Sequence, residues 1–262
     1  MIVHQARIQY KLGETKRIKI LGDIHAGSSH CDERAAKEFI NDPDCYFLGI
    51  GDLMDMVIAS DSKRYRKSGD ASDGDAIVDE QIEKLSGWLR PHKDRILGLG
   101  TGNHEDSITK HCGTNPTQRI CKDLGVPFLG YSWLMELTLS EGGSRGRSVK
   151  IRGHHGFGGG SRTQGADLTK YAREASNWDA DIFLYGHVHR KQADRIPRLG
   201  NVGPKLISKP KLIAITGTFL RTYSKTTDPT YSECKGYPPT EIGGVTINIK
   251  PDSSWVKYWA DL

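Results

Sequence analysis

The sequence predicts an α/β protein with two β-sheets packed as a sandwich and flanked by helices. Short runs rich in Ile and Leu, most ending at a glycine, alternate with helical patterns over the first two thirds of the chain. The last third carries strand patterns without helices between them, which we expect to form a second sheet packed on the first. No repeat or low-complexity linker interrupts the sequence, so residues 1–262 are predicted to form one domain.

Buried strands are predicted where apolar runs stop at a polar loop, at residues 17–23, 45–52, 95–103, 148–155 and 181–187. Residues 131–151 have the pattern of a hairpin that turns at EGGSRGR. The strands expected in the last third lie within residues 210–224, 243–251 and 254–262. Parallel strands that alternate with helices place their carboxyl ends at one edge of a sheet, where ligands gather.

Four helices are predicted between these strands. Asp32 can cap a helix over residues 33–40, and residues 75–89 carry apolar side chains at helical spacing. Residues 115–125 have Pro116 just inside the start and Gly125 at the end, which is the usual asymmetry of a helix. A fourth helix is expected within residues 165–178.

Composition restricts the function classes. The net charge of +5 suits an anionic substrate but is too small to single out nucleic acid. The five cysteines are scattered and form no CxxC, which argues against a disulfide framework or a cysteine zinc site. No apolar run approaches the ~18 residues that span a membrane, and the N-terminus lacks the apolar core of a signal peptide. We therefore expect a cytoplasmic protein without a membrane partner.

Side chains that bind metals follow the predicted strands. They are Asp23, His25, Asp52, Asp55, Asn103, His104, Glu105, His154, His155, His187 and His189. Carboxylate oxygen and imidazole nitrogen are ligands of zinc, manganese and iron. Asp-x-His at 23–25 and His-x-His at 187–189 each direct two side chains to one side of an extended segment. With Asp52, Asn103 and one histidine of the pair 154–155 they make seven ligands, a number that suits two ions sharing a carboxylate.

The order of the motifs D-x-H, G-D-x-x-D, G-N-H-E, H-H-G and G-H-x-H, from Gly22 to His189, resembles the calcineurin-like metallophosphoesterase superfamily. The resemblance implies a two-sheet sandwich flanked by helices. It implies that Asp23, His25 and His189 hold one divalent metal ion and that Asn103, His187 and His154 hold the other. Asp52 would bridge the two ions, and Asp55 would be structural.

Which histidine of the fourth motif binds the metal depends on where its strand ends. In the family the ligand is usually the first histidine after the strand, which favours His154. If the strand itself ends at His154, the alternation of side chains turns His155 towards the site instead. His155 is therefore kept as the alternative, in contact with metal or substrate.

The function that the resemblance implies is dinuclear metal-dependent phosphoester hydrolysis. A hydroxide shared by the two ions (Mn, Zn, Fe or Ni) would attack phosphorus in line. His104 would protonate or stabilise the leaving group, and Glu105 or Asp106 would orient His104. Glu105 is equally expected to be an acidic residue at the N-terminus of a helix. The family often has Asp where this sequence has Glu105.

The substrate is expected to be a phosphate ester, with diesters preferred over monoesters and a nucleotide or nucleic acid among the candidates. The second motif, GDLMDMV, lacks the Arg and Gly that end the corresponding GDxVDRG motif of protein phosphatases, which counts against a protein phosphatase. A nuclease is the first alternative, and a non-catalytic metal-binding scaffold for protein interaction is the second. Arg162 and Arg64 are candidate phosphate contacts. Residues 218–244 include Arg221, Tyr223, Tyr231, Lys235 and Tyr237. They are expected to form a surface loop, with the substrate side or a subunit contact as alternatives. The sequence does not set the oligomeric state.

Overall fold

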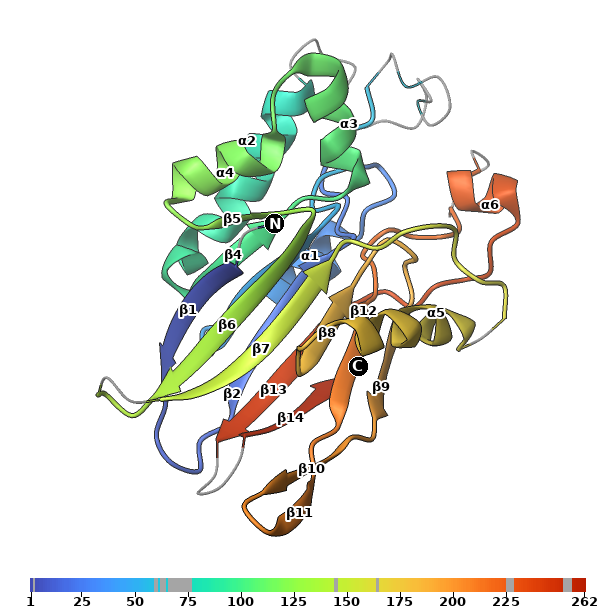
Figure 1. Cartoon of the computed structure of the whole chain (residues 1–262). Helices are drawn as coiled ribbons and strands as arrows, with labels where there is room; N and C mark the ends of the chain where they lie inside the picture. Colours follow the sequence, from blue (N-terminus) through green and yellow to red (C-terminus); the bar gives the residue numbers. More distant parts are fainter. Residues whose placement is uncertain are drawn as a thin grey trace.

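Two mixed six-stranded sheets lie face to face, with helices on the outer face of each, in the computed structural model (Figure 1). The model describes residues 1, 3–58, 61, 65, 77–143, 146–163, 165–224, 229–251 and 256–262. One sheet has the order β1 (Val3–Gln9), β6 (Ser132–Ser140), β7 (Arg147–His154), β8 (Ile182–Tyr185), β12 (Lys211–Thr216) and β9 (Lys191–Ile196). The other has the order β14 (Val256–Asp261), β13 (Val245–Pro251), β2 (Lys16–Gly22), β3 (Cys45–Gly51), β4 (Ile96–Gly100) and β5 (Phe128–Gly130). The predicted fold class is confirmed.

Successive side chains along a strand point to opposite faces of its sheet. One face packs against the other sheet, and the opposite face packs against helices. On β12, Leu212 and Ala214 enter the cluster between the two sheets, whereas Ile213 and Ile215 enter the cluster beneath α5 (Ala166–Glu174). On the other sheet, Leu48 faces the space between the sheets and Phe47 faces the helices. Strands buried on both faces carry continuous apolar runs, as these do.

The helices cover the sheets as the sequence patterns predict. α1 (Glu33–Ile40) begins after Asp32, whose side chain accepts a hydrogen bond from Ala35 N, and α2 spans Ile77–Leu89. In α4 (Pro116–Leu124) the proline stands in the first turn and Gly125 ends the helix with a φ of 71°. α3 (Asn103–Cys112) follows β4 directly and was not predicted. α6 (Tyr231–Lys235) is a short helix beside the candidate site (Figure 1).

The prediction that the C-terminal strands form a second sheet of their own is wrong. β12 joins the sheet of β7 and β8, while β13 pairs antiparallel with β2 and continues to β14. Each sheet therefore contains strands from both ends of the chain. The strands predicted at residues 17–23, 45–52 and 95–103 belong to one sheet, and those predicted at residues 148–155 and 181–187 belong to the other.

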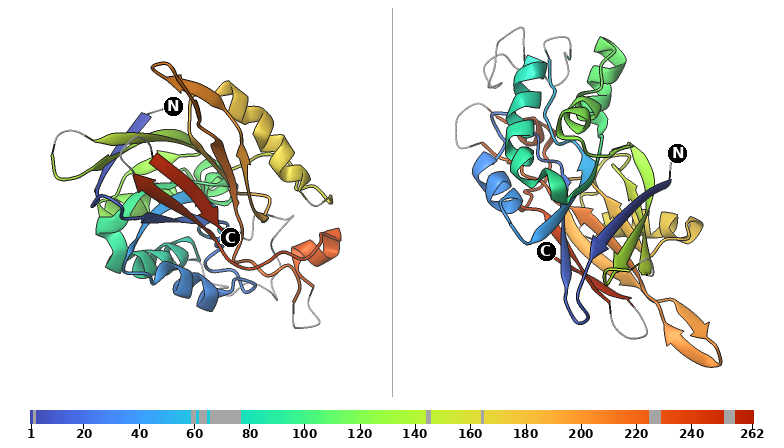
Figure 2. Two further views of the ribbon diagram at one scale, coloured as in Figure 1. Left: turned by 90° about the horizontal axis from the view of Figure 1, so that it is seen from below. Right: turned by 90° about the vertical axis from the view of Figure 1, so that its left-hand side faces the viewer.

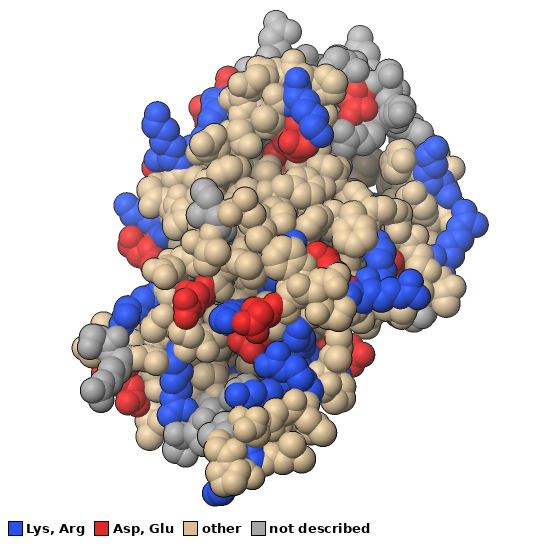
Figure 3. Space-filling view, in the orientation of Figure 1, with Lys and Arg blue, Asp and Glu red and all other residues tan. Residues whose placement is uncertain are grey.

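A two-stranded hairpin, β10 (Leu199–Val202) and β11 (Lys205–Ser208), projects from the end of β9 (Figure 2). Residues 195–211, which include it, hold five Lys or Arg and no Asp or Glu. Elsewhere on the face shown in Figure 3, basic and acidic side chains are mixed. In the described part of the chain, no helix is long and apolar enough to cross a membrane.

Candidate metal centre

The loops after β2, β3 and β4 of one sheet meet the loops after β7 and β8 of the other. Within the first sheet, His25 N donates to Asp52 O over 3.1 Å. Within the second, Gly186 N donates to His155 O over 2.8 Å. The loops of the two sheets are joined by a hydrogen bond of 2.8 Å, which His187 N donates to Asp23 Oδ2. The carboxyl ends of both sheets thus form one polar site.

The backbone of these loops adopts a conformation that L-residues rarely take. Among the described non-glycine residues, positive φ angles occur at Asp23 (47°), His25 (54°), Asp52 (49°), Met56 (50°), His187 (72°) and His189 (55°). A non-glycine residue in this region costs on the order of 1–3 kcal/mol, and such residues cluster at functional sites. Five of the six are side chains singled out from the sequence, so the strain lies where the polar groups converge.

Two glycines allow the loops to approach one another closely. A Cβ on Gly102 would stand 2.1 Å from Asp52 Oδ1, and a Cβ on Gly186 would stand 2.9 Å from Asp23 Oδ2. The glycines of the G-N-H and G-H-x-H motifs are therefore required by space next to a carboxylate, not by their φ angles.

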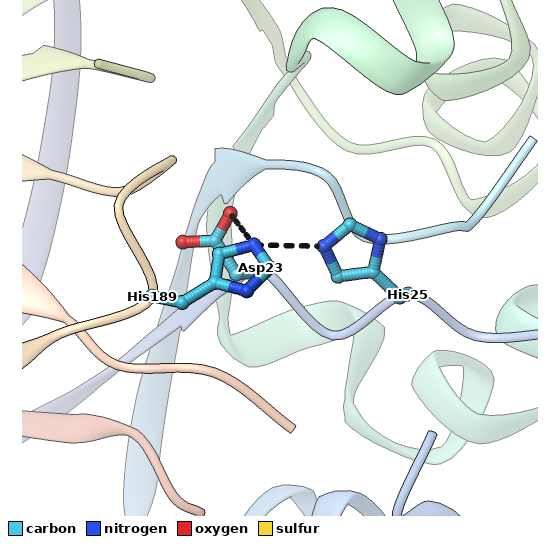
Figure 4. A group of neighbouring side chains, drawn as sticks. All are labelled: Asp23, His25 and His189. Carbon is cyan, nitrogen blue, oxygen red and sulfur yellow. Dashed lines mark hydrogen bonds and ion pairs between the residues drawn. The ribbon is translucent and has the colours of Figure 1, made fainter. Parts of the chain in front are cut away.

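Asp23, His25 and His189 form the first group of converging donor atoms (Figure 4). His25 Nε2 lies 3.2 Å from His189 Nε2, which lies 3.6 Å from Asp23 Oδ1. Asp23 is fully buried, and its Oδ1 has no hydrogen-bond partner in the described structure. The other ring nitrogen of His25 contacts Asp55 Oδ1 at 3.2 Å, which orients the imidazole as a carboxylate does for a metal-binding histidine.

Asp52, Asn103, His155 and His187 form the second group. Asn103 Oδ1 lies 3.0 Å from His155 Nε2 and 2.6 Å from His187 Nδ1. Asp52 Oδ2 lies 3.2 Å from His155 Nε2. Asp52 and His25 also form a group with His104, so Asp52 stands between the two sets of donors.

Burial of these charges shifts their titration. Burial raises the pKa of Asp23 to about 7. Burial lowers the pKa of His155, but the Asp52 carboxylate outweighs it and raises that pKa to about 9. A divalent cation could be bound by Asp23 Oδ1, which has no hydrogen-bond partner in the described structure. It would also displace the proton that His155 holds towards Asp52. The donor set, oxygen and imidazole nitrogen, therefore fits a metal ion of the kind that imidazole and carboxylate bind.

The preference for His154 over His155 is wrong, because β7 continues through His154. His155 is fully buried and points to Asp52 and Asn103. His154 Nδ1 instead accepts a hydrogen bond from Gly156 N, and its ring packs edge-on against Tyr131. Alternation along the strand turns the two rings to opposite sides.

The expected orientation of His104 by Glu105 is also wrong. Both Glu105 oxygens accept hydrogen bonds from backbone N–H groups of the loop after β3 and of Gly102, at 2.7–3.1 Å. Glu105 therefore holds the loop that carries Asp52. Asp55 is the residue beside His104: its carbonyl oxygen contacts His104 Nδ1, and its Oδ1 lies 3.9 Å from the same atom. Asp106 forms an ion pair with Lys110 at 2.6 Å.

A cavity of about 430 Å³ opens over the centre and is lined by His25, Asp52, Asp55, Asn103, His104, His187 and His189 on its inner side. Its outer side includes Gly158–Arg162, Arg190, Arg221, Tyr231 and Tyr237. Arg162, a candidate phosphate contact, lines the cavity, whereas Arg64 lies outside the described residues. Within residues 218–244, Arg221, Tyr231 and Tyr237 line the cavity, and the two tyrosines are also exposed at the surface. Arg190 was missed, although it follows the H-x-H motif directly.

The fold and the site define a two-sheet α/β sandwich with a candidate metal centre at the shared edge of its sheets. No family model and no curated protein matches the chain. Similar solved structures are Vps29 proteins and metallophosphoesterases.

Three of these structures span nearly the whole chain. Vacuolar Protein Sorting 29 from Cryptosporidium parvum is 15% identical, covers 94% of this chain and 97% of its own, and has a TM-score of 0.37. A predicted phosphoesterase from Streptococcus pneumoniae is 15% identical with 95% and 99% covered and a TM-score of 0.33. A metallophosphoesterase from Sphaerobacter thermophilus is 14% identical with 94% and 88% covered and a TM-score of 0.36. At these scores and identities the likeness concerns the fold alone.

Proposed function

We propose that the chain is a calcineurin-like metallophosphoesterase that hydrolyses phosphodiesters with two divalent cations. The observation that carries this proposal is the pair of donor groups on either side of Asp52, at the floor of one cavity. Asp23, His25 and His189 would hold one cation, and Asn103, His155 and His187 the other, with Asp52 shared. When bound, two such ions would activate a water molecule and neutralise charge on the phosphoryl oxygens.

The protein's own residues would then position the reacting groups. Asp55 orients His25, and Glu105 fixes the loop of Asp52 through four backbone hydrogen bonds. As the bond from the water oxygen to phosphorus forms, the bond to the leaving oxygen breaks. His104 lines the cavity with its Nε2 at 3.9 Å from Asp52 Oδ2, so it can donate a proton to the leaving alkoxide.

The shape of the cavity supports diesters as the preferred substrates. It extends from the donor groups to residues 229–240, which leaves room for a second ester group beside the scissile bond. Monoesters would fit the same floor with fewer contacts. A volume of about 430 Å³ lies at the lower end of the range for small-molecule sites, about 300–1,000 Å³.

The test is hydrolysis of bis-p-nitrophenyl phosphate and p-nitrophenyl phosphate by metal-free protein before and after addition of Mn²⁺. We expect turnover only with the metal, faster turnover of the diester, and loss of turnover in a chelator. Asp52→Asn should lower kcat/KM by more than about 100-fold, since even neighbours of metal ligands contribute about 10–100-fold. Asp123→Asn is the matched control, because Asp123 pairs with Arg90 at the surface.

Two results would replace the proposal with an alternative. If the protein holds metal and turns over neither ester, it is a metal-binding scaffold. If it cleaves single-stranded DNA, duplex DNA or RNA internally and leaves the small esters intact, it is a nuclease.

The role of His104 has a separate test. His104→Ala should slow the hydrolysis of diesters with poor leaving groups by about 10²–10⁴-fold, because these need protonation. Esters of p-nitrophenol leave without a proton and should be affected much less. Equal rates for variant and wild type on alkyl esters would disprove the proton-donor role.

A further inference from the structure

Hydrogen bonds between threonine residues stabilise the outer side of the cavity. Thr222 and Thr230 are buried at 7% and 3% exposure, and Thr230 Oγ1 donates to the carbonyl oxygen of Thr222. The hydroxyl groups of Thr222 and Thr240 lie 2.5 Å apart, and Thr240 N donates to Thr222 Oγ1. Hydrogen bonds thus connect Thr222, Thr230 and Thr240 on this side of the cavity.

This side also carries two tyrosines that line the cavity. Tyr231 begins α6, whose start is fixed by reciprocal hydrogen bonds between Thr230 and Glu233. The carbonyl oxygen of Tyr237 accepts a hydrogen bond from Tyr223 Oη over 3.0 Å. The rings of Tyr231 and Tyr237 have centroids 6.4 Å apart at an interplanar angle of 60° and are 45% and 40% exposed. Lys235 Nζ lies over the Tyr231 ring at 5.7 Å from its centroid. The two half-exposed rings at the mouth of the cavity still offer aromatic surface on which a planar group can stack.

Three arginines line the same side. Arg221 is paired with Asp32 at 2.8 Å. Arg190 donates to the carbonyl oxygen of Ser161, and neither Arg190 nor Arg162 pairs with a carboxylate in the described part of the chain. Among the residues that the structure describes, Asp52 and Asp55 are the only carboxylates that line the cavity, and both belong to its inner side. Guanidinium groups bind phosphate oxygens bidentately, so the outer side favours an anionic substrate.

We propose that the outer wall (Arg162, Arg190, Arg221, Tyr231 and Tyr237) is a nucleoside-phosphate subsite, so that the substrate is a nucleotide diester. The base stacks on the tyrosines, and the arginines bind phosphate oxygens outside the donor groups. This inference rests on the proposed phosphoesterase function and adds the chemical class of the group that the diester carries.

The test compares two diesters with the same leaving group and charge, thymidine 5′-(p-nitrophenyl phosphate) and methyl p-nitrophenyl phosphate. Wild type should prefer the thymidine ester. The double variant Tyr231→Ala, Tyr237→Ala should lower the ratio of the two kcat/KM values by about 5- to 100-fold, the range that one stacked base gives on alanine substitution. Tyr231→Phe with Tyr237→Phe keeps both rings and should preserve the ratio.

The arginines are tested in the same assay. Arg162→Ala and Arg190→Ala should raise KM for both esters by similar factors, because the two esters carry the same single phosphate group, and an unchanged KM would contradict the phosphate contacts. Arg34→Ala is the control, because Arg34 is an exposed residue of α1 paired only with Glu38 at its surface, and it should leave both rates unchanged.

A second measurement separates the subsite from the catalytic proposal. Thymidine 5′-monophosphate is titrated into metal-free protein in EDTA by calorimetry, where the alanine double variant should weaken the Kd by a similar factor. If neither ester is hydrolysed by the metal-loaded protein, the proposed function fails while this titration still decides the subsite. An unchanged ratio together with an unchanged Kd would overturn the inference. A short oligothymidylate in the same assay shows whether a free nucleotide ester or a polymer supplies the nucleoside.

Discussion

Adjacent side chains at the end of β7 have opposite surroundings. The His155 ring is fully buried against Asp52 and Asn103, while the His154 ring packs among Tyr131, Phe157 and Tyr185. Burial, followed by the charge of Arg152, lowers the pKa of His154 to about 4, so this imidazole is neutral at physiological pH. One histidine can serve as a ligand, and the other completes an aromatic cluster.

Substitution of each histidine tests this division. His155→Ala should reduce the bound metal by about one ion per chain and abolish turnover, because His155 contacts both Asp52 and Asn103. His154→Ala should retain the metal and lose stability instead, by about 1–3 kcal/mol for the packing lost. Metal analysis of the purified proteins and urea unfolding measure the two effects. The reverse pattern would assign the ligand to His154.

Gly102 gives a second prediction for a single residue. Gly102→Ala places a methyl group 2.1 Å from Asp52 Oδ1 and 2.4 Å from Asp52 N, so the two loops must separate. We expect a loss of about 1–3 kcal/mol in the free energy of unfolding and weaker metal binding. Gly159→Ala is the control, since a Cβ there meets nothing within 4 Å. Equal metal affinity in the two variants would contradict the close-approach argument.

At the scale of elements, Asp42 ties β2 to the segment between α1 and β3. Its carboxylate forms ion pairs with Arg17 at 3.3 Å and Lys19 at 3.0 Å, both on β2. Burial raises the pKa of Asp42, but hydrogen bonds from the Cys45 thiol and Lys19 outweigh it and lower that pKa to about 2. The stabilisation that this shift represents is present above the ordinary value of 3.8 and is lost as the pH falls towards 2.

Asp42→Asn should therefore lower the free energy of unfolding at neutral pH by about 1 kcal/mol, and the deficit should shrink as the pH falls below about 4. Urea unfolding at a series of pH values measures it. Asp44→Asn, with an exposed side chain two residues away, should match wild type at every pH. A deficit that does not change with pH would show that the ion pairs are not its source.

Elements with local signals could be predicted from the sequence, and those that depend on distant partners could not. The cap at Asp32 and the ends of α4 follow from capping chemistry within a few residues. The sheet to which β12 or β13 belongs depends on pairing with β8 or β2, and nothing near those strands in the sequence specifies the partner. α3 was missed because its first turn holds the GNHE motif and its only buried residues are Glu105 and Ile108.

The same distinction holds for the site. The positions of Asp23, His25, Asp52, Asn103, His187 and His189 could be predicted, because each lies within four residues of the end of a strand. Whether His154 or His155 faces the site depends on whether β7 ends before or at His154, and the sequence does not fix the end of a strand to one residue. The role of Glu105 depended on backbone N–H groups of a different loop, to which the sequence gives no pointer.

For the whole molecule, the centre lies between the two sheets and its donor atoms come from both. Binding of a metal should therefore stabilise the entire sandwich and not one loop. At a free metal concentration 100 times the Kd, the free energy of unfolding should rise by about 2.7 kcal/mol. Removal of the metal by EDTA should lower Tm by several degrees, at about 2–4 °C per kcal/mol for a chain of this size.

Differential scanning calorimetry of metal-loaded and metal-free protein measures this difference. Asp52→Asn should show a much smaller dependence of Tm on metal. A metal-dependent change in local proteolysis without any change in Tm would place the stabilisation in one loop only.

The pairing of β13 with β2 joins two strands more than two hundred residues apart and has a consequence for folding during synthesis. Until residues 245–251 have left the ribosome, β2 lacks the neighbour on that side, and Lys19 and Ile20 cannot pair with Thr246 and Val245. Asp23 and His25 follow β2 directly, so their positions depend on a strand made more than two hundred residues later. Long-range pairing of this kind is slow to form and leaves an unpaired strand edge exposed meanwhile. A metal ion held by Asp23 and His25 would therefore bind only once β13 has been made, and until then the open edge of β2 favours aggregation.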